Sequence, residues 1–299
     1  MHVFVTGATG FIGSAVVRDL LDAGHQVVGL ARSEQGATAL KAAGAEVHRG
    51  DLDDPDSLRG PAAASDGVIH LAYRHDLLHS GDLTAAGAVD LRAIETLAAA
   101  LDGSGKPFVY ASGTALVQPS GRPSTEEDTP VEETHRSPAE KAVIALAEHG
   151  VRASVVRLPP TVHGQGDLGF VPALIGFART HGVSAHVGDG AHRWPAVHRL
   201  DAAPLFRLAL ESAPAGTRLH AVADEGVPFR DIADVIGRHL GLPVTSLSGD
   251  EVAAHFGWLA PFVALDVPAS SALTRKQLDW HPSHPGLLAD LDEGHYFSA

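Results

Sequence analysis

The first residues of the chain that could do chemistry are three glycines, Gly7, Gly10 and Gly13, spaced G-x-x-G-x-x-G. They lie between an apolar run from His2 to Val5, which predicts a buried strand, and a segment from Phe11 to Ala23, which predicts an amphipathic helix. The first glycine permits a tight turn, the second lets a pyrophosphate approach the backbone, and the third lets the helix pack closely on the strand. The free N–H groups and the positive dipole end of the helix then face the phosphates. The stretch therefore predicts a dinucleotide-binding turn.

The type of dinucleotide is indicated by the end of the next apolar run, Gln26 to Ala31, which continues into Arg32 and Ser33. Sites that prefer NAD end this strand with an acidic residue, which accepts hydrogen bonds from the adenosine ribose. A guanidinium and a hydroxyl suit a 2′-phosphate, which an acidic residue would repel. The alternative is that Arg32 is a solvated surface cation. We predict NADP, with NAD as the less favoured cofactor.

The composition excludes several other classes of protein. With 299 residues, 44% hydrophobic and 19% charged, the chain is expected to be a soluble globule of one large domain or two unequal lobes. The net charge of −14 argues against nucleic-acid binding, and no apolar run is long enough to cross a membrane. The first predicted strand begins at residue 2 and leaves no room for a targeting peptide, so we expect a cytoplasmic protein.

Metal chemistry is not predicted. The chain has no cysteine, and its 19 histidines are scattered. His75 and His79 form a helical pair, but the glutamate of an H-E-x-x-H pattern is missing.

Strands and helices alternate over the first half of the chain, which demands right-handed crossovers and a parallel sheet covered on both faces. We predict an α/β Rossmann-type doubly wound parallel sheet over residues 1–163. Residues 164–299 are expected to form mainly a smaller C-terminal substrate-binding lobe, with about 188–205 returning to the first domain. Further strands are expected at 46–49, 67–72, 107–112 and 153–158, and helices at 38–43, 83–101 and 138–148.

Six segments in order resemble the extended, NAD-dependent epimerase/dehydratase-like branch of the short-chain dehydrogenase/reductases. They are TGATGFIG at 6–13, GDL at 50–52, HLA at 70–72, RLPPTVHG at 157–164, WPAVHRLDAA at 194–203 and LDWHP at 278–282. The resemblance implies that the glycine turn, with Thr9, Phe11 and Ile12, binds the cofactor. It places Asp51 and Leu52 beside the adenine, Leu71 and Ala72 along the ribose and pyrophosphate, and Pro159 to Val162 on the nicotinamide side. It also implies a possible homodimer.

The resemblance fails at the catalytic Tyr-x-x-x-Lys pair, in which tyrosine acts as acid or base and lysine lowers its pKa. None of the three tyrosines lies four residues before a lysine, and the matching region reads THRSPAEK, residues 134–141. Lys141 can take the lysine position, which puts Ser137 where the tyrosine belongs. A shift of one residue instead pairs Arg136 with Glu140, and the sequence leaves both registers open.

Other candidates for catalysis remain. Ser112 matches the catalytic Ser/Thr position, with Thr114 as the near alternative. Tyr73 directly follows the HLA segment, and His163 stands in place of the tyrosine in the family's V-Y-G segment. A histidine can donate a proton near neutral pH. The alternatives are that Tyr73 packs over the cofactor and that His163 is a structural substitute.

We therefore expect an NADP-dependent oxidoreductase that transfers hydride between the nicotinamide and a carbonyl or imine carbon of a small molecule. One alternative is a nucleotide-sugar epimerase or dehydratase, for which Arg179, Arg193 and Arg199 are the plausible pyrophosphate ligands. The other is a catalytically silent, redox-sensing regulator that binds NADP.

Overall fold

The computed structural model describes residues 1–117, 121–131 and 134–298. Its larger part is a seven-stranded, fully parallel sheet with strand order β10-β6-β5-β4-β1-β2-β3. The strands are β1 (His2–Thr6), β2 (Gln26–Ala31), β3 (Glu46–Arg49), β4 (Gly67–His70), β5 (Pro107–Gly113), β6 (Arg152–Leu158) and β10 (Thr217–His220). The strand order reverses between β1 and β4, and open α/β sheets bind ligands at the carboxyl ends of strands at such a switch point. The predicted doubly wound Rossmann-type sheet is confirmed.

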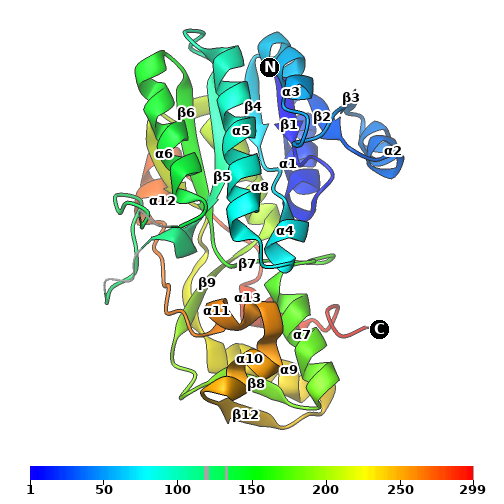
Figure 1. Ribbon diagram of the computed structural model, residues 1–299, viewed down its shortest axis with the longest axis vertical. Helices are drawn as coiled ribbons and strands as arrows, with labels where there is room; N and C mark the ends of the chain where they lie inside the picture. The colour runs from blue at the N-terminus through cyan, green and yellow to red at the C-terminus, as the bar shows by residue number, and fades with distance from the viewer. Residues whose placement is uncertain (118–120, 132–133, 299) are drawn as a thin grey trace.

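Helices cover both faces of this sheet (Figure 1). One face carries α1 (Phe11–Asp22), α2 (Glu34–Ala43) and α8 (Arg199–Ser212), and the other carries α3 (Asp56–Ala64), α5 (Leu83–Leu101) and α6 (Ser137–Ala145). Successive side chains of a buried strand point to opposite faces. In β1, Val3 and Val5 accordingly pack on the α1 side, whereas Phe4 packs on the α5 side. This arrangement explains why the inner strands β1, β2 and β4 read as mainly apolar runs, whereas the edge strands β3 and β10 do not.

A smaller lobe lies beyond the carboxyl ends of the strands, opposite the N-terminus (Figure 1). It holds a three-stranded sheet of β7 (Thr161–His163), β9 (Arg193–His198) and β11 (Asp224–Pro228), and a pair formed by β8 (Ser184–Val187) and β12 (Val244–Leu247). Its helices are α7 (Phe170–His181), α9 (Phe229–Leu240), α10 (Asp250–Phe256), α11 (Ala260–Val263) and α13 (Leu287–Asp292). A separate apolar cluster forms its core. Among the described residues, no helix is long and apolar enough to span a membrane.

The segment that returns to the large domain is longer than the expected 188–205. Helix α8 buries Leu205 and Phe206 on the large sheet, and β10 pairs with β6. Strand β9 instead belongs to the sheet of the smaller lobe. Helix α12 (Ala272–Leu278) also lies on the large domain, where Leu278 and Trp280 join the same apolar cluster.

Three expected elements differ from their predicted bounds by two residues or more. Helix α2 begins at Glu34 rather than at residue 38, because the Ser33 hydroxyl caps it. Strand β4 ends at His70, and residues 71 and 72 turn against the glycine loop. Helix α6 ends at Ala145 and continues as a 3₁₀ turn, η2 (Leu146–His149).

The structure also contains a short helix α4 (His75–His79), with 3₁₀ turns η1 (Thr114–Leu116) and η3 (Gly257–Leu259).

Candidate functional site

The glycine turn has the geometry of a dinucleotide cradle. Gly7 has φ +66°, and a Cβ on it would lie 2.7 Å from the backbone nitrogen of Ala72. A Cβ on Gly13 would lie 2.0 Å from the Gly7 carbonyl oxygen, so the start of α1 packs directly on the turn. The Gly10 N–H closes the turn by donating to the same carbonyl at 2.9 Å. Side chains are thus excluded where the backbone must be close, and the cradle fits a dinucleotide.

The expected adenosine side lies at the carboxyl ends of β2 and β3. The Arg32 side chain is 68% exposed, and its Nε lies 3.9 Å from a carboxylate oxygen of Asp51. Ser33 accepts a hydrogen bond from the Gly36 N–H at 3.1 Å, so its hydroxyl caps α2. Leu52 is buried just after Asp51. An exposed guanidinium with one distant partner is free to turn toward a phosphate, whereas the Ser33 oxygen is already used as a cap.

The other expected cofactor residues lie near the same turn or at the end of β6. Arg199 places its guanidinium carbon 4.9 Å from the centre of the Phe11 ring. Thr9 lies beneath the start of α2, since a Cβ on Gly36 would meet its Cγ2 at 3.1 Å. Ile12 packs on the apolar cluster of α1, and Pro159 is buried at the end of β6.

The contacts of α6 with the sheet bear on the two registers that the sequence leaves open. Arg136, which precedes the helix, and Glu140, one turn later, both contact β5. Lys141 is exposed, and the Ser137 hydroxyl donates to the carbonyl of Val131. These contacts favour the register that pairs Arg136 with Glu140. Ser137, Ala139, Glu140 and Val143 are the buried residues of the helix, and Arg136 before it is half-buried.

Glu140 is the centre of a buried ion-pair network. Its Oε1 accepts hydrogen bonds from Arg157 Nη2 at 2.5 Å and Arg218 Nε at 3.1 Å, and its Oε2 accepts from the Ser112 hydroxyl at 2.7 Å. The side chains of Glu140 and Arg157 are fully buried. Burial by itself would raise the pKa of Glu140, but the hydrogen bond and charge of Arg157 and the Ser112 hydroxyl hold it below its ordinary value. Ser112 donates its proton to this carboxylate, so the proton is not offered to a substrate.

A second buried network connects the glycine turn to Arg136. Asp90 Oδ2 accepts from the Tyr110 hydroxyl at 2.6 Å, and Asp90 Oδ1 lies 3.3 Å from His70 Nε2. His70 Nδ1 shares a 2.6 Å hydrogen bond with Thr6. Arg136 Nη2 donates to the Tyr110 hydroxyl at 3.0 Å and to the carbonyl of residue 111 at 2.6 Å. Burial opposes ionisation of Asp90, but His70 and Arg136 lower its pKa overall.

Tyr73 lies where β4 leaves the sheet, beneath Arg136. The Arg136 guanidinium carbon is 4.4 Å from the centre of the Tyr73 ring, and the His75 ring meets Tyr73 edge-on at 5.4 Å. Burial raises the pKa of Tyr73 to about 12, although the charge of Arg136 acts to lower it. Among the described residues, the buried hydroxyls of Tyr73 and Thr114 have no hydrogen-bond partner.

These two orphan hydroxyls follow neighbouring parallel strands, β4 and β5, at the edge that carries the dinucleotide cradle. Buried hydroxyl groups are nearly always hydrogen-bonded, so an orphan pair at a ligand-binding edge calls for an oxygen from a bound molecule. Each of the two hydroxyls retains an O–H that is available to donate to a bound molecule.

His163 belongs to a different group of side chains. It is fully buried in β7, and its Nδ1 lies 2.8 Å from Asp290 Oδ2 in α13. Its ring meets that of His198 edge-on at 5.4 Å. These contacts tie the C-terminal helix to β7 and β9, which is the structural alternative considered for this residue.

Sequence reasoning missed Asp90, Tyr110 and Arg157 as members of the buried networks. A signal existed for two of them. Asp90 lies on the apolar face of a long predicted helix, and Arg157 interrupts the apolar strand ASVVRL. A charge at a core-facing position requires a buried partner.

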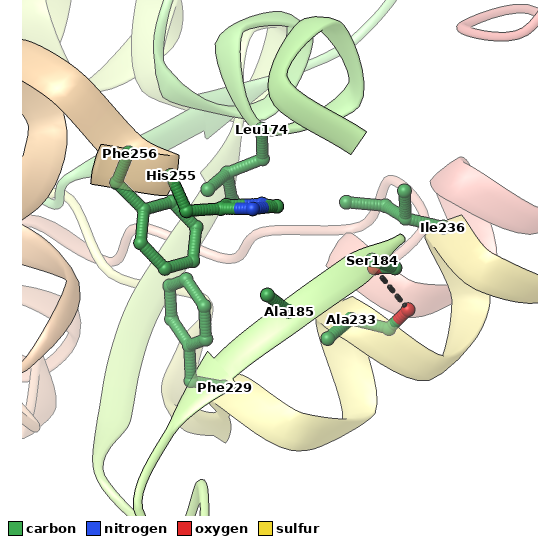
Figure 2. Close-up of a pocket in the computed structure, with 8 residues that line it drawn as sticks. All are labelled: Leu174, Ser184, Ala185, Phe229, Ala233, Ile236, His255 and Phe256. Carbon is green, nitrogen blue, oxygen red and sulfur yellow. Dashed lines mark hydrogen bonds between the residues drawn. The ribbon is translucent and has the colours of Figure 1, made fainter. Parts of the chain in front are cut away.

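A cavity in the smaller lobe is too small to be the substrate site. It lies between α7, α9, α10 and β8, is lined mainly by apolar side chains such as Leu174, Phe229 and Ile236, and has a volume of about 10 Å³ (Figure 2). Ser184 donates to the carbonyl of Ala233 beside it at 2.8 Å. A space of this size holds at most about one water molecule.

Comparison with known proteins agrees with the dinucleotide-binding fold described above. The model of the NAD-dependent epimerase/dehydratase family matches residues 3–222. The chain is 48% identical over 298 residues to an uncharacterised Schizosaccharomyces pombe protein, C2A9.02, covering 99% of this chain and 100% of that protein. It is 28% identical over 264 residues to 2-alkyl-3-oxoalkanoate reductase from Stenotrophomonas maltophilia, covering 81% of this chain and 77% of the reductase.

A solved structure shares the fold. The crystal structure of DesIV, a dTDP-glucose 4,6-dehydratase from Streptomyces venezuelae with NAD and TYD bound, has a TM-score of 0.78 to this chain. The identity is 18%, over 98% of this chain and 96% of the dehydratase chain.

Proposed function

Because this chain belongs to the NAD-dependent epimerase/dehydratase family, within the extended short-chain dehydrogenase/reductases, we propose that it is an NADP-dependent reductase of small carbonyl or imine compounds. The observation that carries the proposal is the pair of buried, unpartnered hydroxyls on Tyr73 and Thr114 beside the dinucleotide cradle. The relative named as a 2-alkyl-3-oxoalkanoate reductase supports a carbonyl substrate.

The bound dinucleotide supplies the hydride, and the residues of this chain hold the substrate oxygen or nitrogen and deliver a proton. The Thr114 hydroxyl orients the substrate heteroatom, and the Tyr73 hydroxyl donates the proton to it. Arg136, stacked over the Tyr73 ring at 4.4 Å, stabilises the tyrosinate that forms. In the Tyr-x-x-x-Lys pair, the lysine supplies this cation. Here Arg136 supplies it, and in the register that pairs Arg136 with Glu140 it stands at the position of the tyrosine.

The raised pKa of Tyr73 favours reduction over epimerisation. With a pKa of about 12, Tyr73 keeps its proton at neutral pH. A protonated phenol is suited to act as an acid, whereas epimerisation starts with oxidation of an alcohol and needs a base.

The arginines considered for a nucleotide-sugar pyrophosphate do not converge. Arg193 pairs with Asp266 at 2.9 Å, and Arg179 donates to the carbonyl of Phe297 at 3.0 Å. Arg199 alone of the three lies against the glycine turn.

Turnover tests the role of Tyr73. Purified protein is given NADPH and a panel of ketones, aldehydes and imines, and NADPH oxidation is followed by absorbance. Tyr73→Phe should lower kcat by about 100-fold, because a positioned proton donor contributes on that order, with unchanged NADPH affinity. Tyr296→Phe, which removes a phenol hydroxyl in the smaller lobe, serves as the matched control. Equal rates for wild type and Tyr73→Phe would rule Tyr73 out, and NADPH binding without turnover on any substrate would favour the regulator.

Binding tests the choice of NADP. Arg32→Ala should weaken NADPH about 10-fold or more, since a charge-assisted hydrogen bond contributes about 1.5–3 kcal/mol, and should change NADH affinity little. Arg59→Ala removes a different exposed arginine, which lies on α3, and is the control for overall charge. Equal weakening of NADPH and NADH by Arg32→Ala would contradict the assignment.

A further inference from the structure

Three side chains at the end of α13 bring metal-ligand atoms together. They are Asp290, Glu293 and His295, and one carboxylate oxygen, a second carboxylate oxygen and one imidazole nitrogen lie within 4.8 Å of one another. Asp290 is buried, His295 is half-buried and Glu293 is exposed. All three border an open cavity of about 320 Å³, which His198 and Arg199 also line.

The Asp290 carboxylate is held in a fixed orientation. Its Oδ2 lies 2.8 Å from the Nδ1 of fully buried His163, which leaves Oδ1 directed to His295 Nε2 at 3.0 Å. Two atoms that bind one ion at 2.0–2.2 Å lie about 3 Å apart at the bond angles of four- to six-coordinate ions. The spacing therefore suits an ion between the two side chains, and a hydrogen-bonded partner on the other carboxylate oxygen is the usual support for such a ligand.

His198 presents a further polar group to this cavity. It is 8% exposed, and its Nδ1 accepts a hydrogen bond from the Leu200 N–H at 3.3 Å. Nε2 therefore carries the proton, and among the described residues nothing accepts a hydrogen bond from it. Burial, and next the charge of His163, lower the pKa of His198 to about 4, so the ring is neutral at physiological pH. A neutral N–H donor in the cavity suits the oxygen of a water bound to an ion.

We propose that Asp290, Glu293 and His295 bind one divalent transition-metal ion, with water from the cavity completing its coordination. One imidazole and two carboxylates form a mixed nitrogen and oxygen donor set, which suits Zn²⁺ or Mn²⁺ better than the all-oxygen sites of Mg²⁺ and Ca²⁺. The D-x-x-E-x-H spacing differs from the H-E-x-x-H pattern sought in the sequence. The site does not depend on the proposed reductase activity.

Zinc binding to the full-length, chelator-stripped protein tests the site, by isothermal titration and by metal content after dialysis. We expect one tightly bound Zn²⁺ per chain and a higher Tm with the ion. Glu293→Gln and His295→Gln should each weaken binding by about 10-fold or more. Glu293 is exposed, so its replacement leaves the fold intact and keeps the test decisive if His295→Gln is unstable.

The chain offers a matched control, because scattered histidines can bind zinc weakly. His281 lies 2.9 Å from Asp279, both side chains are exposed, and neither borders the cavity. His281→Gln should leave the high-affinity site unchanged. Absence of stoichiometric binding, or equal loss in Glu293→Gln and His281→Gln, would show that Asp290 and His295 form an ordinary ion pair.

Discussion

Replacing Glu140 by glutamine tests whether this buried carboxylate on α6 is the partner in a structural ion pair. The substitution keeps the shape of the side chain and removes its charge. The charge that is lost is that of the Glu140 carboxylate, which accepts hydrogen bonds from Nη2 of the fully buried Arg157 at 2.5 Å and from its Nε at 3.2 and 3.3 Å. The same carboxylate accepts from Ser112 at 2.7 Å and from Arg218 at 3.1 Å.

The expected loss of stability follows from what remains around Arg157. Its other partner is the neutral ring nitrogen of His220 at 3.2 Å, which cannot balance the charge. Arg218 is 21% exposed and can turn toward water, so it adds little to the loss. Removing one partner of a buried pair costs about 3–5 kcal/mol, and we expect about 3 kcal/mol here because glutamine still accepts one hydrogen bond. At about 2 °C per kcal/mol for a chain of this size, Tm should fall by about 6 °C.

Urea and thermal unfolding, followed by circular dichroism, measure the effect. Glu148→Gln removes an exposed carboxylate from the adjoining turn η2 and should change stability by less than about 0.5 kcal/mol. The double variant Glu140→Gln, Arg157→Met should lose less than Glu140→Gln alone, since it leaves no buried unpaired cation. A loss below about 1 kcal/mol in Glu140→Gln, or no recovery in the double variant, would refute the reasoning.

Three further predictions concern the turn, a histidine and a serine. Gly13→Ala should abolish NADPH binding, measured by fluorescence, because the added Cβ would lie 2.0 Å from the carbonyl oxygen of Gly7. Gly60→Ala is the control and should bind NADPH normally, because its added Cβ meets nothing within 4 Å. Burial, and next the charge of Arg157, lower the pKa of His220 from 6.5 to about 4, so the unfolded chain takes up this proton first. Stability should therefore fall as the pH drops from 6.5 to 4, and His220→Gln should remove about 3 kcal/mol of that fall in urea titrations at several pH values. Ser112→Ala should lower the free energy of unfolding by about 1–3 kcal/mol and leave kcat within about twofold, because its hydroxyl serves a buried carboxylate; a large drop in kcat would return it to the catalytic site.

The parts of the fold that could be predicted depend on local demands. A parallel strand buried on both faces must be apolar along its length, so the sequence shows most plainly the inner strands β1, β2, β4, β5 and β6. Gly7 and Gly13 are required by backbone atoms a few ångströms away, and the spacing of the turn records that requirement. The seventh strand, β10, is not among the expected strands, because its sequence TRLH is short and half polar.

The register of α6 depends on tertiary contacts that the sequence does not show. The segment before it lacks periodicity, and the helix is too short for its apolar face to be read with certainty from THRSPAEK. Only the position of the helix against β5 shows that Arg136 and Glu140 contact the sheet and that Lys141 is exposed. Buried charges elsewhere could have helped, because Arg157 in an apolar strand requires a carboxylate nearby.

If the protein is a carbonyl reductase as proposed, it keeps the phenol and the cation that the reaction needs, but other elements of the fold supply them. The phenol comes from Tyr73 after β4 instead of from α6, and the cation over it comes from Arg136 instead of from a lysine one turn later. A carboxylate at residue 140 then becomes acceptable, because Arg157 and Arg218 neutralise it. The exchange has a chemical consequence. A lysine beside a catalytic tyrosine lowers the tyrosine pKa toward neutrality, whereas Tyr73 keeps a pKa of about 12 beneath a guanidinium that is already bonded to Tyr110 and β5. This site should therefore reduce carbonyl compounds far better than it oxidises alcohols near neutral pH. The rate of alcohol oxidation, and not that of carbonyl reduction, should rise as the pH increases toward the pKa of Tyr73.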